Sequence, residues 1–441
     1  MNLLGVGSFR GGVPMADHKE LTCDCAITPV PTPARVVLPV KQHIGALAQV
    51  VVKKGDVVQK GQLIAQCDGK VSANICASVS GTVIDISPQP HHSGCPVPAV
   101  VIETGEKQVW QTDLTPVSLD EVKPSEIVDI VKKAGIVGMG GAGFPTHVKL
   151  TPPRDKVIQT LIINGCECEP YLTGDYRLMV EHPKEVVFGA KALAKAVGAE
   201  QVFIGVEDNK PKAIQALQEA ADDGISVIPL RTKYPQGAEK QLIYSILERE
   251  VPRGGLPMDV GVMVNNVATA YAVWQALVKG WPLVERVVTV TGEGIAKPGN
   301  YLVPLGMTVG DLIEACMGFV GDPGKIILGG PMMGTAITDL RVPITKDTTG
   351  IVVLTREQAR REVVYPCIKC GRCLEVCPVY LVPTAIARFA EHDELDAAEE
   401  YGARCCIECG CCSFVCPSNR PLVHWIQVAK AKLGLIGDNV G

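Results

Sequence analysis

The chain has 441 residues, of which 47% are hydrophobic and 20% are charged, and its formal net charge is −5 at pH 7. A single hydrophobic core rarely grows beyond about 250–300 residues, so this length predicts several domains. The acidic balance argues against a nucleic-acid-binding protein and against a polybasic membrane anchor. Because Asn265 and Asn266 interrupt the most apolar window, 260–278, we predict no membrane-spanning helix.

Residues 1–34 are rich in Gly, Pro and short polar runs and lack the pattern of a signal peptide, so they are predicted to form an arm. From 35 to 115, short Val and Ile strands alternate with turns such as Lys54-Gly55-Asp56, which indicates an all-β unit. The pattern resembles the barrel-sandwich fold of biotinyl and lipoyl domains. Lys70 lies near the place of a carrier lysine, but its flanking residues favour a scaffold hairpin.

Helix-like stretches alternate with apolar strands over residues 120–282, which is typical of an α/β domain. This region contains the glycine-rich loop Gly138-Met-Gly-Gly-Ala-Gly-Phe-Pro-Thr-His-Val-Lys149. Glycines let backbone N–H groups approach a phosphate without interference from Cβ atoms. A helix N-terminus and Lys149 would complete an anion site. Taken alone, the loop could also be a tight structural turn.

Residues 283–345 read as a strand, a Pro-Gly turn, a second strand and a helix capped at Thr308, which suggests a small β-grasp unit. The segment shows no residues of obvious chemical function. We therefore interpret it as a spacer between its neighbouring domains.

Residues 360–420 carry two cysteine runs with the spacing C-x2-C-x2-C-x3-C-P, and every ligand position recurs after 39 residues. Thiolates at this spacing surround one corner of a 4Fe-4S cube, and the fourth cysteine usually ligates the other cluster. Zinc knuckles or disulfides are the alternative, but zinc sites favour two cysteine pairs at longer separation, often with His. The predicted ligands of the first cluster are Cys367, Cys370, Cys373 and Cys416. The predicted ligands of the second cluster are Cys406, Cys409, Cys412 and Cys377.

The segment between the two runs includes an Ala- and Glu-rich stretch, 384–404, that predicts helix. Its length resembles an α-helical ferredoxin rather than the compact β-hairpin kind. The tail, 421–441, begins with apolar residues spaced for a short amphipathic helix, which we expect to pack on the cluster domain.

Four segments of the α/β domain resemble, in the same order, segments of the NADH-binding flavoprotein subunit of respiratory complex I. Besides the glycine-rich loop, they are Asn164-Gly-Cys-Glu-Cys-Glu-Pro170, Tyr234-Pro-Gln-Gly-Ala-Glu239 and Asn265-Asn-Val-Ala-Thr269. The chain departs from the complex I pattern at two of these positions, where Cys166 replaces an Asp and Ala238 replaces a Glu.

Carried over residue by residue, this resemblance implies a flavin and nucleotide site. The residues expected to hold FMN and its phosphate are Gly138, Gly140, Gly141, Gly143, Lys149, Asn265, Asn266 and Thr269. Asn164 and Glu167 are expected to touch the isoalloxazine ring. The residues expected around the nicotinamide nucleotide are Phe144, Glu169, Tyr234, Gly237 and Glu239. Of these, Glu169 is the predicted catalytic residue.

The order of the domains resembles the RnfC family, whose members belong to the Rnf electron-transport complexes, and this resemblance covers essentially the whole chain. It implies FMN, NAD(H) and two 4Fe-4S clusters as cofactors. It also implies a peripheral subunit on the cytoplasmic face of the inner membrane. There, integral membrane partners and flavin or iron–sulfur partners would couple ferredoxin:NAD+ oxidoreduction to Na+ or H+ translocation. Two alternatives remain at this point: a soluble NADH-dependent reductase, such as a cobalamin reductase, and a non-redox scaffold that holds structural metal.

Overall fold

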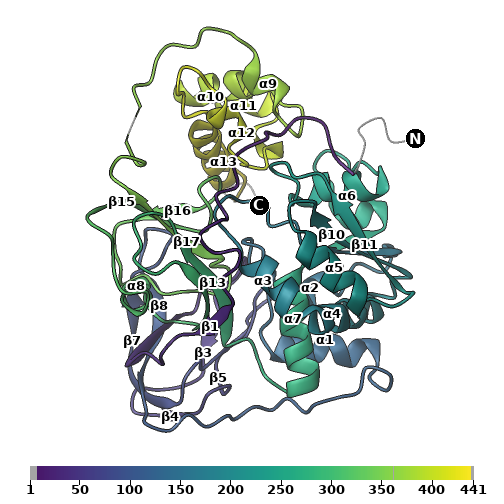
Figure 1. The fold of residues 1–441 in the computed structure, drawn as a ribbon, viewed down its shortest axis with the longest axis vertical. Helices are drawn as coiled ribbons and strands as arrows, with labels where there is room; N and C mark the ends of the chain where they lie inside the picture. Colours follow the sequence, from purple (N-terminus) through teal and green to yellow (C-terminus); the bar gives the residue numbers. More distant parts are fainter. Residues whose placement is uncertain (1–6, 361, 439–441) are drawn as a thin grey trace.

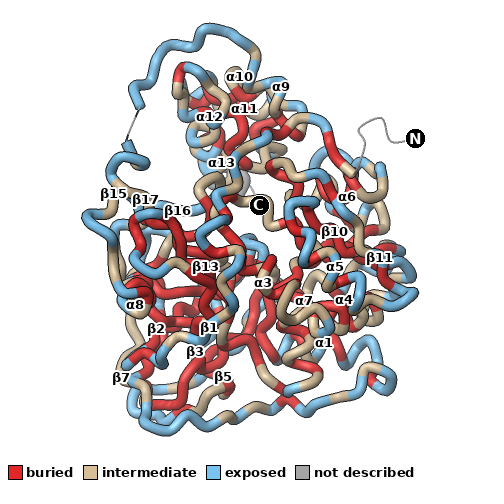
Figure 2. The backbone as a smooth tube through the Cα atoms, viewed as in Figure 1, coloured by how far each residue is buried: buried red, intermediate tan, exposed pale blue. Residues whose placement is uncertain are grey.

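The computed structural model describes residues 7–360 and 362–438, which form four packed units and an N-terminal arm (Figure 1). In the view of Figure 1 the cysteine-rich helical unit lies at the top, the α/β unit at the right and the β-rich units at the left. Buried residues follow the sheets of the lower units, whereas residues 362–370, which lead into the first cysteine run, are exposed (Figure 2). No helix in the described part of the chain is both long and apolar enough to cross a membrane.

The predicted barrel-sandwich consists of two small antiparallel sheets, of order β2-β8-β7-β4 and β3-β5-β6. Their strands are β2 (Arg35–Pro39), β3 (Gln49–Val50), β4 (Val57–Val58), β5 (Leu63–Gln66), β6 (Ile75–Cys76), β7 (Gly81–Gln89) and β8 (Val97–Thr104). Alternating Val and Ile side chains of these strands point inward and form one core with the helices that cover one face of the α/β sheet. The two units therefore share a continuous hydrophobic core.

The α/β unit is built on a four-stranded parallel sheet of order β11-β10-β9-β12. Its strands are β9 (Thr160–Asn164), β10 (Gln201–Glu207), β11 (Ile225–Leu230) and β12 (Val262–Asn266). Its helices are α1 (Pro124–Lys133), α2 (Thr146–Lys149), α3 (Gly174–Glu181), α4 (Pro183–Val197), α5 (Pro211–Ala220), α6 (Glu239–Leu247) and α7 (Val267–Trp274). Helix α4 shows the local logic: Pro183 begins it, apolar residues at helical spacing bury one face, and Gly198 in a left-handed conformation ends it.

The β-grasp unit is a six-stranded mixed sheet of order β1-β14-β13-β17-β15-β16, covered by helix α8. Its elements are β13 (Glu285–Thr291), β14 (Gly299–Pro304), α8 (Val309–Ala315), β15 (Pro323–Leu328), β16 (Thr335–Ile337) and β17 (Gly350–Thr355). The predicted cap is present, since Thr308 Oγ1 accepts a hydrogen bond from Asp311 N at 3.1 Å. The sheet extends beyond the predicted range 283–345, because β17 and the arm's strand β1 (Ile27–Pro29) also belong to it.

The cysteine-rich unit is helical, as its sequence predicts. It consists of α9 (Arg372–Glu375), α10 (Pro383–Glu391), α11 (Leu395–Glu400), α12 (Cys411–Phe414) and α13 (Leu422–Asp438). Helix α13 packs against α10 through Leu422, Ile426 and Ala429, which are all buried. The tail therefore belongs to the core of this unit, and the predicted boundary at residue 421 falls where that helix begins.

The N-terminal arm is an ordered strap across three units. Gly12 N donates to Val376 O at 2.8 Å in the cysteine-rich unit, and Val13 pairs with Tyr234 in the α/β unit. Further along, the strand β1 pairs in parallel with β14 of the β-grasp sheet. In Figure 1 the purple segment can be followed from the cysteine-rich unit down to β1. The arm thus fixes the positions of these units relative to one another.

Candidate redox site

A cavity of about 500 Å³ opens at the carboxyl ends of β9 and β12. The chain places β10 and β11 on one side of β9 and then returns to place β12 on the other side. Such a reversal of strand order leaves a crevice at the carboxyl ends of the two diverging strands, which is where α/β sheets bind ligands. Asn164 ends β9 and its register partner Asn266 ends β12, so the sheet topology brings two of the predicted motifs together.

Twelve of the fifteen predicted cofactor-binding residues line this cavity. They are Gly138, Gly140, Phe144, Lys149, Asn164, Glu167, Glu169, Tyr234, Gly237, Glu239, Asn265 and Asn266. Gly141, Gly143 and Thr269 do not line it, although they belong to the same motifs. Of the two departures from complex I, Ala238 lines the cavity, whereas Cys166 is completely buried outside it.

The glycine-rich loop is a closed turn. Gly138 N donates to Phe144 O at 2.8 Å, and Gly143 N donates to Gly138 O at 3.1 Å. Gly141 and Gly143 have φ values of +110° and +62°, a region that residues with a Cβ atom rarely adopt. Thr269 supports the loop from behind, because its Oγ1 accepts from Met139 N at 3.0 Å. These three residues therefore shape the loop.

The strand-end asparagines connect the motifs to one another. Asn164 Nδ2 donates to Gly237 O at 2.8 Å. Asn266 caps α7 by accepting from Ala268 N at 2.8 Å, and its Nδ2 donates to Asp175 Oδ2 at 2.6 Å. The Nδ2 atom of Asn265 is buried on the cavity side and has no hydrogen-bond partner among the described residues. A buried donor without a partner is costly, so a polar ligand in this cavity would satisfy it.

Lys149 and Glu239, both predicted to contact ligand, are paired with each other. Lys149 Nζ lies 2.9 Å from Glu239 Oε1 and also donates to Val264 O at 2.6 Å. The positive charge of Lys149 is thus already balanced at this wall of the cavity.

Glu167 caps a helix in addition to lining the cavity. Its carboxylate accepts from Asp175 N at 2.7 Å and from Tyr176 N at 3.1 Å, at the start of α3. A carboxylate at this position also interacts favourably with the helix dipole. The backbone of Glu167 has a φ of +46°, so the chain turns sharply here and presents the carbonyl groups of the following residues to the arm.

Glu169 joins the α/β unit to the β-grasp unit across the cavity. Its carboxylate accepts from Met332 N at 3.1 Å and from Met333 N at 2.8 Å. The approach is close enough that a Cβ atom at Gly330 would lie 2.3 Å from Glu169 Oε2. Burial raises the pKa of Glu169 to about 7, although the two N–H donors oppose that shift.

Three polar residues of this site were not found from the sequence: Lys19, Asp175 and Arg286. Lys19 Nζ donates to Glu167 O and Glu169 O, each at 3.0 Å, and to the carbonyl oxygen of Leu172. Its side chain is buried, and burial lowers its pKa. Neither periodicity nor a motif marks it in the arm.

Asp175 and Arg286 both line the cavity. Burial, followed by the charge of Glu167, raises the pKa of Asp175 to about 7. Asp175 lies just after the second motif, and Arg286 opens the first strand of the β-grasp unit. Only the fold shows that the two residues face the same space.

The eight predicted cluster cysteines gather around two separate cavities. Each cavity takes three cysteines from one run and the fourth from the other. The first, of about 800 Å³, is lined by Cys367, Cys370, Cys373 and Cys416. The second, of about 20 Å³, is lined by Cys377, Cys406, Cys409 and Cys412, and also by Cys411. These are the two sets predicted from the spacing. Within the described chain, no three His, Cys, Asp or Glu side chains converge on the position of a single metal ion.

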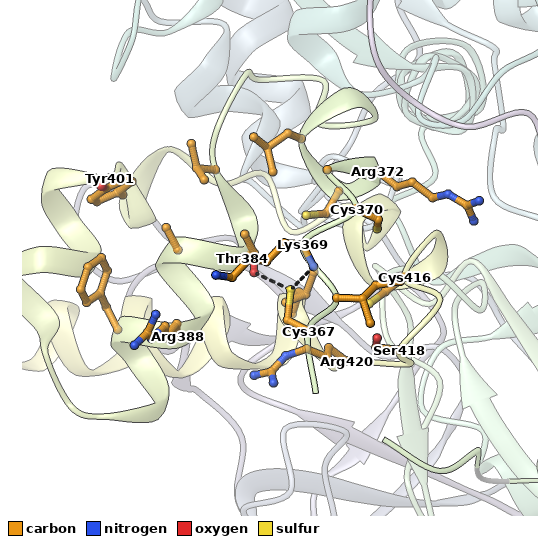
Figure 3. A pocket seen from close by; sticks show the side chains of 18 of the residues that line it. Cys367, Lys369, Cys370, Arg372, Thr384, Arg388, Tyr401, Cys416, Ser418 and Arg420 are labelled. Atoms are coloured by element: carbon orange, nitrogen blue, oxygen red, sulfur yellow. Dashed lines mark hydrogen bonds between the residues drawn. The ribbon is translucent and has the colours of Figure 1, made fainter. Parts of the chain in front are cut away.

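The two cysteine runs adopt the same local conformation. Lys369 N donates to Cys367 Sγ at 3.4 Å, and the equivalent Glu408 N donates to Cys406 Sγ at 3.4 Å (Figure 3). Lys369 and Glu408 have φ values of 56° and 58°. Backbone N–H groups directed at sulfur stabilise thiolate, and the N–H of Lys369 lowers the pKa of Cys367.

The two sets differ in their exposure to water. Cys367 and Cys370 are exposed, whereas Cys377, Cys409 and Cys412 are each 7% exposed. Figure 3 shows Cys367, Cys370 and Cys416 around the first cavity, with the arginines 372, 388 and 420 nearby.

The second cysteine set borders the cavity at the carboxyl ends of the sheet. Ile407 and Cys409 line both this cavity and the second cluster site. Tyr234, 2% exposed, fills the boundary, and its hydroxyl donates to Cys409 O at 2.8 Å. The first set shares no lining residue with this cavity. Of the two cysteine sets, the second is therefore the neighbour of the α/β cavity.

Three segments match known protein domains. Residues 7–107 match the RnfC barrel sandwich hybrid domain, residues 131–275 the Nuo51 FMN-binding domain, and residues 287–336 the SLBB domain. The chain is 48% identical to the subunit designated C of the proton-translocating ferredoxin:NAD(+) oxidoreductase complex of Clostridium ljungdahlii, covering 98% of this chain and 95% of that relative. It is 45% identical to the corresponding subunit of the Na(+)-translocating ferredoxin:NAD(+) oxidoreductase complex of Acetobacterium woodii, covering 97% of each.

The chain belongs to the RnfC family. It is also 46% identical to the RnfC-type subunit of the ion-translocating oxidoreductase complex of Rhodobacter capsulatus, covering 97% of this chain and 83% of that one. Among solved structures, an NAD+-reducing NiFe hydrogenase in the H2-reduced state superposes with a TM-score of 0.52 at 21% identity, covering 73% of this chain and 65% of that one. The predicted fold class is confirmed, with its barrel-sandwich, flavoprotein-like α/β and SLBB-like β-grasp units.

Proposed function

We propose that this member of the RnfC family passes electrons between NAD(H), FMN and two 4Fe-4S clusters. In this proposal it is a peripheral subunit of a membrane-bound ferredoxin:NAD+ oxidoreductase complex. Its relatives at 48% and 45% identity are named as subunits of ion-translocating complexes of that activity. The partners are integral membrane and flavin or iron–sulfur subunits, which translocate Na+ or H+ and exchange electrons with ferredoxin. We place the chain on the cytoplasmic face, where NAD(H) is available.

The observation that carries this proposal is the shared wall between the α/β cavity and the second cysteine set. FMN would supply the conversion between the two-electron hydride of NADH and the single electrons that 4Fe-4S clusters carry. A chain that hosts both kinds of centre needs them as neighbours, and Cys409 and Ile407 border both sites. The hydrogen bond from Tyr234 to Cys409 O fixes one site relative to the other.

The residues of the cavity fit a flavin phosphate ester. The glycine-rich loop would offer its backbone N–H groups to the phosphate, and the unpaired Nδ2 of Asn265 would donate to a polar group of the ligand. Glu169 holds the β-grasp loop over the cavity and so restricts the access of water. Lys19 holds the chain that carries both Glu167 and Glu169.

The two cysteine sets would hold the clusters in series. The second set, mostly buried, lies beside the cavity, and the first set, partly exposed, lies farther out. Electrons would therefore pass between the cavity and a partner by way of the second set and then the first. The alternative of a soluble reductase is not favoured, because the relatives that match nearly the whole chain are named as complex subunits.

Anaerobic purification of the full chain with flavin and iron analysis tests the proposal. We expect about one FMN and about eight irons per chain, and loss of the flavin absorption when NADH is added. Iron without flavin would instead indicate a ferredoxin-like adaptor. Flavin that is reduced in a chain without iron would return the cysteine runs to zinc or disulfides. Co-purification with membranes separates the complex subunit from a soluble reductase.

A further inference from the structure

Arg286 is a buried cation in the wall of the proposed flavin cavity. It is 3% exposed and lies in β13 of the β-grasp unit. It stands outside the segment 131–275 that matches the FMN-binding domain, and just before the segment 287–336 that matches the SLBB domain. Its side chain reaches from the β-grasp sheet to the glycine-rich loop of the neighbouring unit.

The hydrogen-bond partners of Arg286 are all carbonyl oxygens. Its Nη2 donates to Met139 O and its Nε donates to Val287 O, each at 3.3 Å, and its Nη1 donates to Lys346 O. None of the ion pairs formed by the described residues includes Arg286. A guanidinium group has five N–H donors, so some donors are left over. A buried charge without an opposite charge in contact is costly, and a bound anion would remove that cost.

The guanidinium group stays charged in this position. Burial lowers the pKa of Arg286 to about 10, while the carboxylates of Asp175 and Asp347 oppose that shift. Asp175 also faces this part of the cavity, but burial raises its own pKa to about 7 and Asn266 Nδ2 already donates to it. Asp175 is therefore a weak counter-charge near neutral pH.

Arg286 acts on the same loop whose amides would receive a phosphate. Met139 is held from both sides, its N–H by Thr269 Oγ1 and its carbonyl by Arg286. The N-terminus of α7, capped by Asn266, lies against Gly140, because a Cβ atom at Gly140 would lie 3.4 Å from the Cβ atom of Asn266. The positive end of a helix, an unpaired guanidinium and a glycine turn thus meet at one end of the cavity.

The cation expected at this place from the sequence is Lys149, and it is already neutralised by Glu239. We propose that Arg286 binds the phosphate group of the flavin and makes the site selective for FMN over riboflavin. The planar guanidinium fork suits bidentate binding of a phosphate. This inference rests on the proposed function, since it requires a flavin in the cavity.

The test compares FMN and riboflavin binding to the flavin-free full chain by quenching of flavin fluorescence. In Arg286→Met we expect the FMN affinity to fall roughly 10- to 150-fold, as for the loss of a hydrogen bond to a charged group. The riboflavin affinity is expected to change less than about threefold, because riboflavin lacks the phosphate. Arg286→Lys keeps the charge without the fork, so it should lose FMN affinity to an intermediate degree. The matched control is Arg341→Met, an exposed arginine of the same unit, which should leave both affinities unchanged.

The ratio of the two affinities decides the outcome, because retained riboflavin binding also shows that the cavity is folded. If Arg286→Met and Arg286→Lys weaken FMN and riboflavin equally, Arg286 only supports the loop and the inference is wrong. If FMN binding is unchanged in both variants, the inference is also wrong. A wild-type chain that binds neither flavin would overturn the proposed function together with this inference.

Discussion

Glu169→Gln removes half of the hydrogen bonding that closes the β-grasp loop over the cavity. The carboxylate accepts from Met332 N at 3.1 Å and from Met333 N at 2.8 Å, whereas an amide offers one oxygen and turns its NH2 group toward the second donor. Losing one such bond costs about 1–2 kcal/mol, because the partner N–H groups are only partly buried. We therefore expect kcat/KM for NADH oxidation by an artificial electron acceptor to fall about 5- to 30-fold.

The pH dependence of the same assay separates Glu169 from a general loss of structure. Since burial raises the pKa of Glu169 to about 7, the carboxylate that accepts both bonds is lost as the pH falls through 7. Activity of the wild-type chain should decline over that range, and Glu169→Gln should lack this part of the profile. Glu126→Gln is the control, because Glu126 accepts one backbone N–H at 2.7 Å far from the cavity. Unchanged kcat/KM and an unchanged pH profile in Glu169→Gln would refute the assigned role.

Two further predictions follow from buried contacts. Cys377→Ser should lose the EPR signal of the second cluster and keep that of the first, because Cys377 lines the cavity of the second set. Cys416→Ser should show the converse, and loss of the first cluster in Cys377→Ser would contradict the crossed ligation. Lys19→Met leaves three carbonyl groups without their donor, so FMN should dissociate at least about tenfold faster. Lys212→Met, which removes an exposed ion pair, should leave FMN dissociation unchanged; equal behaviour of the two lysine variants would contradict the role of the arm.

The parts of the site that local sequence determines could be predicted. Each cysteine run places its ligands within one short loop, so their spacing predicts both sets before any fold is known. Asn164 and Asn266 end neighbouring parallel strands, and the carboxyl ends of such strands meet at one edge of a sheet. The predicted cap at Thr308 is also local, since its partner N–H lies three residues away.

Contacts between distant parts of the chain could not be predicted in this way. Lys19 reaches carbonyl groups that lie 148 to 153 residues away, and nothing in the arm's composition marks that residue for burial. Arg286 meets the glycine-rich loop only because the β-grasp sheet packs against the α/β unit. Gly141 and Gly143 belong to a phosphate-binding motif, but their left-handed conformations turn the loop, so that they shape the cavity without lining it.

Electron transfer through this chain depends on the second cluster, which would connect the α/β cavity to the first cluster. Freeze-quench EPR after mixing with NADH tests this order most directly in two variants of the full chain, each retaining one cluster. In Cys416→Ser we expect NADH to reduce the retained second cluster. In Cys377→Ser we expect the retained first cluster to stay oxidised on the same timescale, because its connection to the cavity is gone. Equally fast reduction of the first cluster in Cys377→Ser would contradict the order of the two sites.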